Sequence, residues 1–541
     1  MARTIAKTVN PERMPAADNM KMEKFVEARV NLGMITQIDP SDIPTGALQL
    51  AKNATVRFDR TSRRYGTVLL TPIKPNALTV LKTLFIKKNN GSPYTLRFTP
   101  TTVHSRQAAG WSPYTTLAAL TGTVSDRIST AFVLDNLVFA NNGADEIQLV
   151  NFAAETHADL GNAPKYRYVT GFYNRVVGAA LRGVNEVQIG WSGDGNIAEW
   201  NPITDESSGN SPLVESPSDL SDYITGVFGL SNVLIVLREQ SVWVGYKQPI
   251  AQFPFNFQAA IPGVGCDAPH SATVILGGVA WLDTRTAGVY AYTPGGELDR
   301  IGQNVESEII KNVTDPKNIF GSYNPVFNEY TVCIPQVGST LVRAWTYNFR
   351  TKAWVFSEYD SITSLDDTDL GTAGTTIDQL VGSIDNLQGT IDSLSPTAVN
   401  ISTRLFGKNT GDILLENPNA DRDAQLTPTS ANDGLIYETV LATKTFNIPE
   451  VDTYIAQVRI DYRPIKQCTL TLEYSKDGGD TDGSWKVAKS VTPVLINKTQ
   501  LLIFNKNIKT RKFAFRVRAS NGLFELVAFE IHVYPGGKSD G

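Results

Sequence analysis

The chain has 541 residues, of which 42% are hydrophobic and 19% are charged, and its formal net charge is −5. This length exceeds one ordinary domain and predicts two or three folded units with enough apolar residues for their cores. The mild negative charge argues against a dedicated nucleic-acid binder, which carries a basic excess. Three widely spaced cysteines, Cys266, Cys333 and Cys468, exclude a disulfide framework and predict reduced, buried thiols.

The N-terminal segment, residues 1–45, is polar and contains four prolines. We expect an arm that orders against a neighbouring molecule, with a short amphipathic stretch, Met20 to Val30, that is compatible with a helix. The first residues lack an apolar stretch of the signal-peptide type, and no run approaches the roughly 18 apolar residues that span a bilayer. The sequence therefore predicts a protein made in the cytoplasm, without a secretion signal or a membrane anchor.

A β-hairpin pattern recurs six times between residues 46 and 357. Each copy has a strand with apolar residues, a polar tight turn and a second strand rich in valine and aromatic residues. The copies begin at Leu81, Leu134, Tyr173, Leu230, Leu276 and Phe327. Strand-only repeats of roughly 40–50 residues are typical of β-propeller blades, and a pair of β-sandwiches is the alternative. Because the internal order is kept six times, we predict a six-bladed β-propeller over residues 46–357.

An acidic segment follows at residues 358–403. No basic residue lies between Lys352 and Arg404, and a seven-residue repeat, TIDQLVG, SIDNLQG and TIDSLSP, begins at Thr376. Ile and Leu take the a and d spacing of a coiled coil, but Gly382 and Gly389 weaken a helix. We interpret the segment as an extended acidic insertion, with a helix as the alternative. Its candidate interface residues are Asp366, Asp367, Asp369, Asp378, Asp385 and Asp392.

The C-terminal part is predicted to contain a second β domain. We expect residues 404–433 to return the chain to the propeller. Residues 434–541 contain alternating strand patterns at regular spacing, from TYIAQVRIDYRP to FELVAFEIHVYP, which indicate a β-sandwich. The predicted fold is therefore all-β: a six-bladed β-propeller with a C-terminal β-sandwich and an N-terminal arm.

Residues with catalytic chemistry are scarce. The four histidines, His104, His157, His270 and His532, show no metal-ligand spacing, and the chain has no phosphate-binding glycine loop and no nucleophile elbow. Loops 192–200 and 475–485 loosely resemble the Asp-box turn of sialidases, but their spacing to the tryptophan is wrong. We predict that the protein is not an enzyme and uses no cofactor.

Three aspartates form one candidate cation site. Asp477, Asp480 and Asp482 are clustered, as a hard cation such as calcium requires. No bidentate glutamate follows at EF-hand spacing. A solvated loop without a metal is therefore the preferred interpretation.

Two basic clusters are candidate contacts for DNA or for another subunit. They consist of Arg57, Arg60, Arg63 and Arg64 in one predicted hairpin, and of Lys512, Arg516 and Arg518 on one predicted strand. A cationic strand face suits a phosphate backbone, whereas a solvated face is the alternative for any single residue. We hypothesise that the basic stretch 498–518 pairs with the acidic stretch 358–392 of an adjacent subunit.

Several motifs in a fixed order carry a family resemblance. They are ALQLAKNATVRFDRTSRRYGT at 47–67, WSGDGNIAEWNP at 191–202, and the segments 224–246, 254–296 and 320–356. Together they resemble the tail nozzle and packaged-DNA stabilisation proteins of podovirus-type bacteriophages, over roughly residues 45–400.

The resemblance implies a structural protein of the virion tail. It would form a six-fold ring below the tail adaptor protein, retain packaged double-stranded DNA in its lumen, conduct that DNA during ejection, and carry tail fibres or spikes on its outside. The competing interpretation is a propeller binding module of the tail, which docks fibres or recognises a host glycan. A ring and a peripheral binding module differ in stoichiometry.

Overall fold

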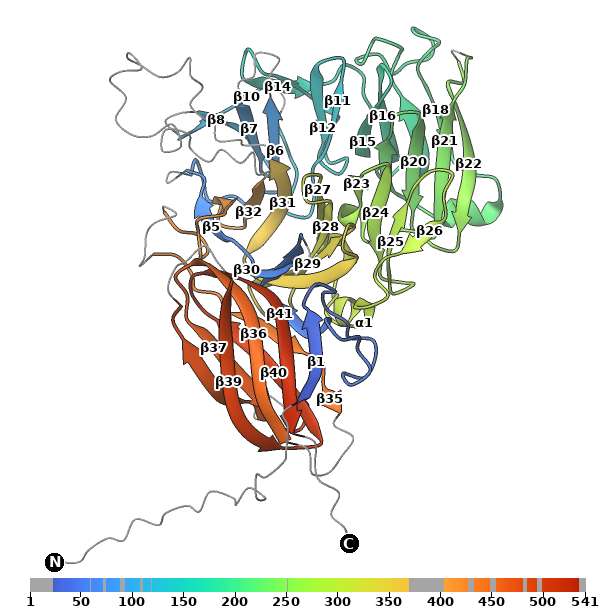
Figure 1. Ribbon diagram of the computed structural model, residues 1–541. Coiled ribbons are helices and arrows are strands. Elements are labelled where there is room, and N and C mark those ends of the chain that lie inside the picture. Colours follow the sequence, from blue (N-terminus) through green and yellow to red (C-terminus); the bar gives the residue numbers. More distant parts are fainter. Residues whose placement is uncertain are drawn as a thin grey trace, which may run out of the picture.

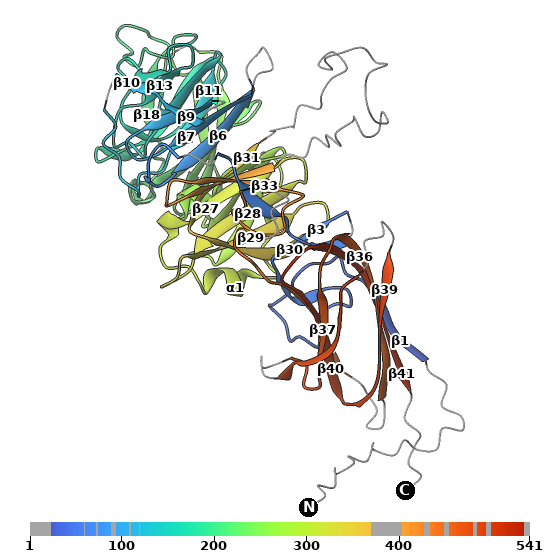
Figure 2. The same ribbon diagram turned by 90° about the vertical axis from the view of Figure 1, so that its left-hand side faces the viewer.

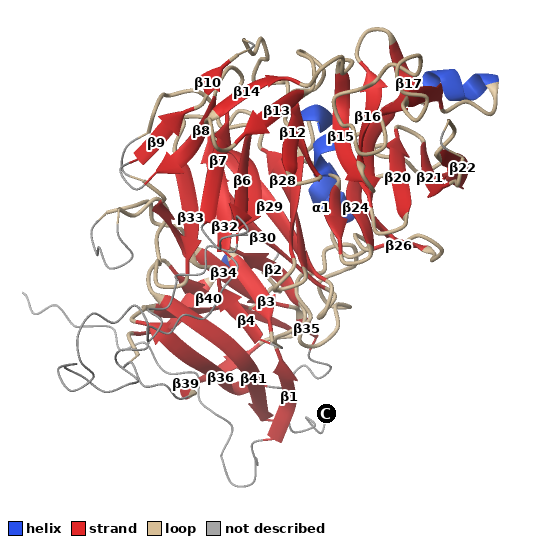
Figure 3. Cartoon of the chain, turned by 90° about the horizontal axis from the view of Figure 1, so that it is seen from above, coloured by secondary structure: helices blue, strands red, loops and turns tan. Residues whose placement is uncertain are grey.

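The computed structural model describes residues 23–534, apart from residues 59, 72–73, 88–92, 108–109, 118, 251, 369–402, 427–432, 448–453, 480–483 and 494–498. Strands account for nearly all the regular structure in this part of the chain (Figure 3). The predicted all-β fold is confirmed. A β-propeller and a β-sandwich lie end to end (Figures 1 and 2).

Six sheets of the propeller follow one another along the chain. The strands of each sheet are given from the innermost outward. The first sheet contains β6 (Lys82–Lys87), β7 (Pro93–Phe98), β8 (Val103–Gln107) and β9 (Gly110–Pro113), and the second contains β11 (Ser129–Val133), β12 (Asn136–Ala140), β13 (Gln148–Asn151), β14 (Thr156–Asp159) and β10 (Thr115–Thr116). The third contains β15 (Tyr166–Phe172), β16 (Arg175–Leu181), β17 (Asn185–Trp191) and β18 (Gly209–Pro212).

The next three sheets have the same plan. They are β19 (Ile224–Gly229), β20 (Val233–Arg238), β21 (Ser241–Lys247) and β22 (Phe255–Pro262); β23 (Thr273–Ile275), β24 (Gly278–Asp283), β25 (Gly288–Tyr292) and β26 (Leu298–Arg300); and β27 (Phe320–Asn324), β28 (Glu329–Pro335), β29 (Leu341–Asn348) and β30 (Ala353–Asp360). Each of the six predicted hairpins lies in a separate sheet, which confirms the propeller fold and the six predicted repeats; a seventh sheet completes the ring.

One more four-stranded sheet closes the ring. It contains β31 (Ile362–Thr368), β32 (Thr403–Lys408), β33 (Ile413–Asn417) and, as its outer strand, β5 (Gly66–Leu69). Its inner strand β31 contacts β27 on one side and β6 on the other, so the sheet lies between the sixth and the first sheets. The structure therefore places 362–368 and 403–417 in the ring itself, where we expected an insertion and a return segment.

The sandwich packs two sheets face to face (Figure 2). One contains β39 (Gln500–Lys509), β36 (Tyr454–Lys466), β41 (Leu523–Tyr534), β4 (Arg60–Arg63) and β3 (Ala54–Arg57), with β1 (Glu23–Arg29) paired to β41. The other contains β2 (Leu48–Lys52), β34 (Thr439–Thr443), β40 (Lys512–Ala519), β37 (Leu470–Ser475) and β38 (Lys486–Val491), with β35 (Phe446–Asn447) paired to β40.

Strand β1 corrects the expectation of an N-terminal arm for its described part. Residues 23–29 pair antiparallel with β41 of the same chain, from Glu23 opposite Val533 to Arg29 opposite Ala528, and Figure 1 shows β1 in blue beside β41 in red. Phe25, Val26 and Ala28 pack against the sandwich core. This apolar contact favours a strand over the helix that the amphipathic pattern suggested. Residues 48–63 likewise belong to the sandwich and not to the propeller.

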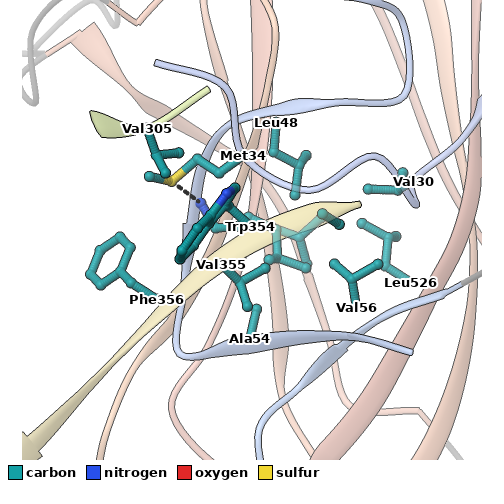
Figure 4. Packing of buried hydrophobic residues seen from close by; sticks show 14 of the residues in the cluster. Val30, Met34, Leu48, Ala54, Val56, Val305, Trp354, Val355, Phe356 and Leu526 are labelled. Carbon is teal, nitrogen blue, oxygen red and sulfur yellow. Dashed lines mark hydrogen bonds between the residues drawn. The ribbon is translucent and has the colours of Figure 1, made fainter. Parts of the chain in front are cut away.

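The two domains share one sheet and one core. Lys52 of β2 pairs in parallel with Phe356 of β30, so the sixth propeller sheet continues into the sandwich. Trp354 is 1% exposed and donates from Nε1 to the Ile301 carbonyl at 2.7 Å. Figure 4 shows it in one buried cluster with Met34, Val56 and Leu526. A continuous sheet over a shared core leaves no flexible linker at this junction.

The short helices connect propeller strands. They are α1 (Glu306–Ile310) and the 3₁₀ turns Pro217–Ser221, Pro269–Ser271 and Pro316–Asn318. None of the helices in the described ranges is both long and apolar enough to cross a bilayer. The three cysteines are free and buried, as predicted.

Candidate functional site

A polar channel runs between the innermost strands of the propeller. Its cavity has a volume of about 340 Å³, and β6, β11, β15, β19, β23, β27 and β31 all contribute to its wall. This volume is at the lower end of the range for small-molecule sites. A sheet exposes its inner strand edge to the channel, so residues that precede each predicted hairpin form the wall.

Arg127 is a buried cation in the channel wall. Arg127 is 9% exposed, and its guanidinium lies 5.1 Å from the centre of the Phe320 ring. It donates to the carbonyl of Asn318 at 3.4 Å and to that of Thr363. No carboxylate in the described part of the chain forms an ion pair with it. Burial lowers the pKa of Arg127 to about 10, because water no longer stabilises the charged form.

Lys82, in contrast, has its own counter-charge. Its Nζ lies 3.3 Å from Oδ1 of Asp366. Oδ2 of Asp366 accepts from the backbone N–H of Thr83 at 2.9 Å and from the Thr83 hydroxyl at 2.8 Å. The carboxylate of Asp366 is therefore fully engaged within the first and closing sheets.

His270 lies close enough to both cations for them to affect its protonation. Burial, followed by the charges of Arg127 and Lys82, lowers the pKa of His270 to about 3. The imidazole is therefore neutral at physiological pH, with one N–H to donate. It adds a hydrogen-bonding group but no charge to this part of the channel.

Asp367 is the second carboxyl of the wall. Its oxygens accept from the Ser322 hydroxyl at 2.8 Å and from the Asn324 amide at 2.9 Å, and Nε of Arg404 lies 4.0 Å away. Burial nevertheless raises the pKa of Asp367 to about 7, because desolvation of the carboxylate outweighs these donors. Asp367 therefore changes its charge near neutral pH.

Two hydroxyls in the channel wall have no hydrogen-bond partner. They belong to Thr225 of β19 and Ser364 of β31, which are 5% and 4% exposed. A buried hydroxyl without a partner costs free energy. Both hydroxyl oxygens are fully enclosed by the protein, so they represent an internal cost of packing and are not donors to the channel.

An apolar rim lies along part of one mouth of the channel. We define it as Leu134, Tyr173, Leu276 and Val326, which lie in the turns after β11, β15, β23 and β27 and are 46–81% exposed. The turns are neighbours in space. The Gly171 backbone packs on the carbonyl of Phe132 and that of Gly229 on the carbonyl of Gly171. Cavities also join the turn after β19 to Ile275, and Leu276 to Pro325.

Two rim residues have strained backbone conformations. Leu134 has φ +49° and Tyr173 has φ +53°, in the left-handed region that Asn and Gly adopt at lower cost. Bulky apolar residues in this region are outliers, and such outliers concentrate at functional positions. The turn chemistry alone would favour a small polar residue at both positions.

The predicted basic hairpin holds the two domains together. Arg57 makes two 2.8 Å hydrogen bonds to Glu329, and Arg64 binds Asp423 with two hydrogen bonds of 2.8 and 2.5 Å. Arg63 is 1% exposed and stacks over the Tyr437 ring at 4.2 Å. These three side chains are buried and engaged within the chain, which corrects their predicted role as external contacts. Only Arg60 is exposed, and it pairs with Glu525 at 2.8 Å.

The second basic cluster lies on β40. Lys512 is exposed. Arg516 pairs with Glu473 and lies 4.6 Å from the Trp485 ring centre, and Arg518 pairs with Glu438 and Glu473. The acidic partners of both arginines therefore come from their own sandwich and not from residues 358–392.

The predicted acidic and calcium-binding residues are only partly described. Asp366 and Asp367 lie in the channel wall, whereas Asp369, Asp378, Asp385, Asp392, Asp480 and Asp482 and the heptad repeat 376–394 lie outside the described residues. Asp477 accepts from the Ser475 hydroxyl and from the Gly479 N–H at 3.1 Å, as a turn residue does. Across the described ranges, no group of three or more His, Cys, Asp and Glu side chains is arranged to hold a metal.

Sequence reasoning missed Arg127, Thr225 and His270. Each precedes or begins an inner strand, and nothing in its local sequence distinguishes it from an ordinary polar residue. Only the order of the repeats would have shown that these positions face a common axis.

No known protein family and no curated protein sequence matches the chain. Among solved structures, the chain is similar to the extracellular domain of a putative hybrid two-component system from B. thetaiotaomicron, with 9% identity and a TM-score of 0.34. That alignment covers 66% of this chain and 40% of the other, so this chain spans less than half of that domain. A carbohydrate-binding module, TmCBM61, solved with β-1,4-galactotriose, aligns with 18% of the chain at 15% identity and a TM-score of 0.14. These similarities are too weak to identify a ligand.

Proposed function

We propose that the protein is a non-catalytic binding module whose propeller docks a protein partner at the apolar rim. The observation that carries this proposal is that Leu134, Tyr173, Leu276 and Val326 stand at the tips of turns around one mouth, 46–81% exposed. Contiguous exposed apolar groups mark interaction surfaces. A row of them beside a channel suits a protein partner better than a sugar, whose hydroxyls require polar groups.

The strained turns support the same proposal. The conformations of Leu134 and Tyr173 cost stability that Asn or Gly would recover. Lys247 extends over the Tyr173 ring, with Nζ 3.9 Å from its centre, and adds a cation beside the rim. Apolar anchors with adjacent charged groups are typical of protein interfaces.

The test is selection of binding peptides from a random display library against the full chain. We expect enriched peptides to be rich in apolar residues and to lose at least about tenfold in affinity for Leu276→Asp and Val326→Asp, because burial of a new charge opposes docking. The matched control is Val487→Asp, which changes a valine on β38 of the sandwich whose exposure, 63%, lies between those of Val326 and Leu276. If the peptides bind the two rim variants with the same affinity as wild type, the rim is not the docking surface. If instead wild type binds a sugar on a glycan array and both variants lose that binding, the ligand is a sugar.

A ring-forming tail nozzle is the second candidate function. The rigid junction favours it, because a shared sheet and buried ion pairs suit a load-bearing part of a virion. Duplex DNA would pass between copies and not through one propeller, since a cavity of about 340 Å³ holds only a small molecule. In this role the protein would contact a tail adaptor, fibres or spikes, and DNA without sequence preference.

Stoichiometry separates the two candidates. Sedimentation velocity over a range of concentrations, together with negative-stain images, would show closed six-fold rings for a nozzle. A monomer at all concentrations, alone and with the other tail proteins, would contradict the nozzle and leave the binding module.

A further inference from the structure

We infer that the outer edge of β22 is the interface of a homodimer, in which the β22 strands of two copies pair antiparallel. β22 is the outermost strand of the fourth sheet, so its free edge lies on the circumference of the propeller (Figure 1). The apolar rim lies at the channel mouth instead. The inference therefore does not depend on the proposed docking function.

The other sheets of the propeller have protected outer edges. β30 continues into the sandwich through β2, and β14 is covered by β10. The N–H groups of Gly66 and Leu69 on β5 donate to the carbonyls of Ala420 and Gln425. The outer strands β9, β18 and β26 have only three or four residues, and each contains a proline or charged side chains. Short length, proline and charge all hinder the pairing of a sheet edge with another chain.

β22 lacks these protections along most of its length. Its eight residues, FNFQAAIP, include no charged side chain, and the proline is the last of them. Within the described ranges its backbone hydrogen bonds go only to β21. Asn256, Gln258 and Ala259 are exposed. A bulge at Ala260 ends the regular part of the strand, so residues 255–259 present an open edge to which a further strand can pair.

A second copy of the chain is the partner that matches this edge in charge. Because β22 is uncharged, two identical edges do not repel each other. A charged segment of another protein would lose hydration at this edge without gaining an ion pair on the strand. Two copies related by a two-fold axis bring the same surface together from both sides.

The geometry of an antiparallel ladder fixes the register. Two opposite residues either exchange both hydrogen bonds or exchange neither, so a two-fold ladder between identical strands is centred on a residue. Centring on Phe257 pairs the whole regular segment and places Asn256 opposite Gln258 of the second copy. These exposed amide side chains then meet on both sides of the axis, and each amide carries donors and an acceptor for the other.

Apolar residues beside the strand extend the contact. Ile250 and Phe253 precede β22 and are 55% and 66% exposed. The same register places Phe253 beside Ile261 of the second copy, once on each side of the axis. Burial of these side chains adds hydrophobic stabilisation to the hydrogen bonds of the ladder.

Sedimentation velocity of the full chain, at concentrations up to about 100 µM, tests the inference. We expect wild type to form dimers. Asn256→Lys/Gln258→Lys places like charges opposite each other twice and should raise the dimer Kd by about tenfold or more. Circular dichroism should show an unchanged fold, because both side chains are exposed. The matched control is Asn210→Lys/Pro212→Lys, at two exposed positions of the same spacing on β18, and it should dimerise as wild type does.

A second variant separates a lost interface from a damaged strand. Asn256→Glu/Gln258→Glu should also weaken the dimer when it is alone. An equimolar mixture of the lysine and glutamate variants should form dimers again, because each lysine then lies opposite a glutamate.

Three results would each overturn the inference. They are a wild type that stays monomeric, association that both the lysine and the glutamate variants retain, and a mixture of the two variants that stays monomeric. Peptides selected on the rim should bind the lysine variant as they bind wild type, so the docking proposal and the dimer proposal fail separately.

Discussion

At the scale of single residues, burial determines what each charged side chain does. Arg57 and Arg64 look like surface cations in the sequence, but in the structure each forms a bidentate ion pair within the chain. Arg127 has no such counter-charge and lies in a cavity. Asp367 is an intermediate case: it has hydrogen-bond donors, but they offset only part of the cost of burying its carboxylate.

Asp367 is expected to make stability depend on pH. Its pKa rises from 3.8 to about 7 on folding, so the folded chain holds a proton that the unfolded chain releases. The corresponding stabilisation is complete below pH 3.8 and is lost as pH rises to about 7. We expect the free energy of unfolding of wild type, relative to Asp367→Asn, to fall by up to about 1.4 kcal/mol per pH unit in this window. Urea unfolding at pH 5, 6, 7 and 8 tests this.

The control for this measurement is Asp477→Asn. The Ser475 hydroxyl and other donors lower the pKa of Asp477 below 3.8, so this carboxyl stays ionised from pH 5 to 8. Its substitution should therefore shift stability equally at each pH. A difference between wild type and Asp367→Asn that stays constant with pH would contradict the assignment of a raised pKa.

At the scale of elements, the closing sheet joins the two ends of the propeller segment. β5 pairs with β33 from Leu69 opposite Leu414 to Gly66 opposite Asn417. Gly66 packs so closely on Arg422 that an added Cβ would lie 2.1 Å from its carbonyl oxygen. A strand from before the first sheet thus completes the last one, which removes the two free edges that an open ring would have.

The register of β31 and β32 predicts that residues 369–402 are dispensable for the fold. Thr368 and Thr403 are paired neighbours in the sheet, and a two-residue Asn-Gly turn joins strands in this relation. Replacement of 369–402 by Asn-Gly should therefore keep the circular dichroism spectrum. Each doubling of the length of a loop adds about 0.6 kcal/mol to the entropic cost of closing it. The shorter loop should therefore also raise the free energy of unfolding by about 2 kcal/mol. A variant that fails to fold would show that the segment is part of the core.

At the scale of the whole molecule, one buried carboxylate connects the two domains. Glu329 on β28 is 1% exposed and accepts from Arg57 of the sandwich and from Arg404 of the closing sheet, at 2.8–2.9 Å. Although burial opposes ionisation, these two guanidinium groups hold the pKa of Glu329 below its usual value. The propeller and the sandwich therefore behave as one rigid body at this junction.

Glu329→Gln is expected to weaken this connection. The substitution leaves two buried guanidinium groups without their shared counter-charge, which should lower the free energy of unfolding by about 3–5 kcal/mol. Differential scanning calorimetry should then resolve separate transitions for the two domains, whereas we expect one transition for wild type. Glu27→Gln, at an exposed ion pair of β1, should change stability by less than about 1 kcal/mol. A single transition at an unchanged temperature in Glu329→Gln would contradict this account.

The sequence by itself determined the strands, because a hairpin is a local structure. Alternation, turn residues and β-branched content within some 20 residues were sufficient to locate six hairpins, beginning at Leu81 and ending with that at Phe327, and the all-β fold followed. The closing sheet had no such local pattern. Its first two strands are separated by residues 369–402, and its outer strand lies near the other end of the chain.

Only the tertiary structure decided what the polar residues do. Strands that are far apart in sequence determine the partners of each arginine. They bring Arg57 to Glu329, and they leave Arg127 without an ion pair to any carboxylate in the described part of the chain. The same fact brings Thr225 and Asp367 from two different sheets, and His270 from the 3₁₀ turn Pro269–Ser271, to one channel. Periodicity within a strand reports which face is apolar, but the energy of a buried charge depends on its neighbours across the ring, and those are set by closure of the propeller.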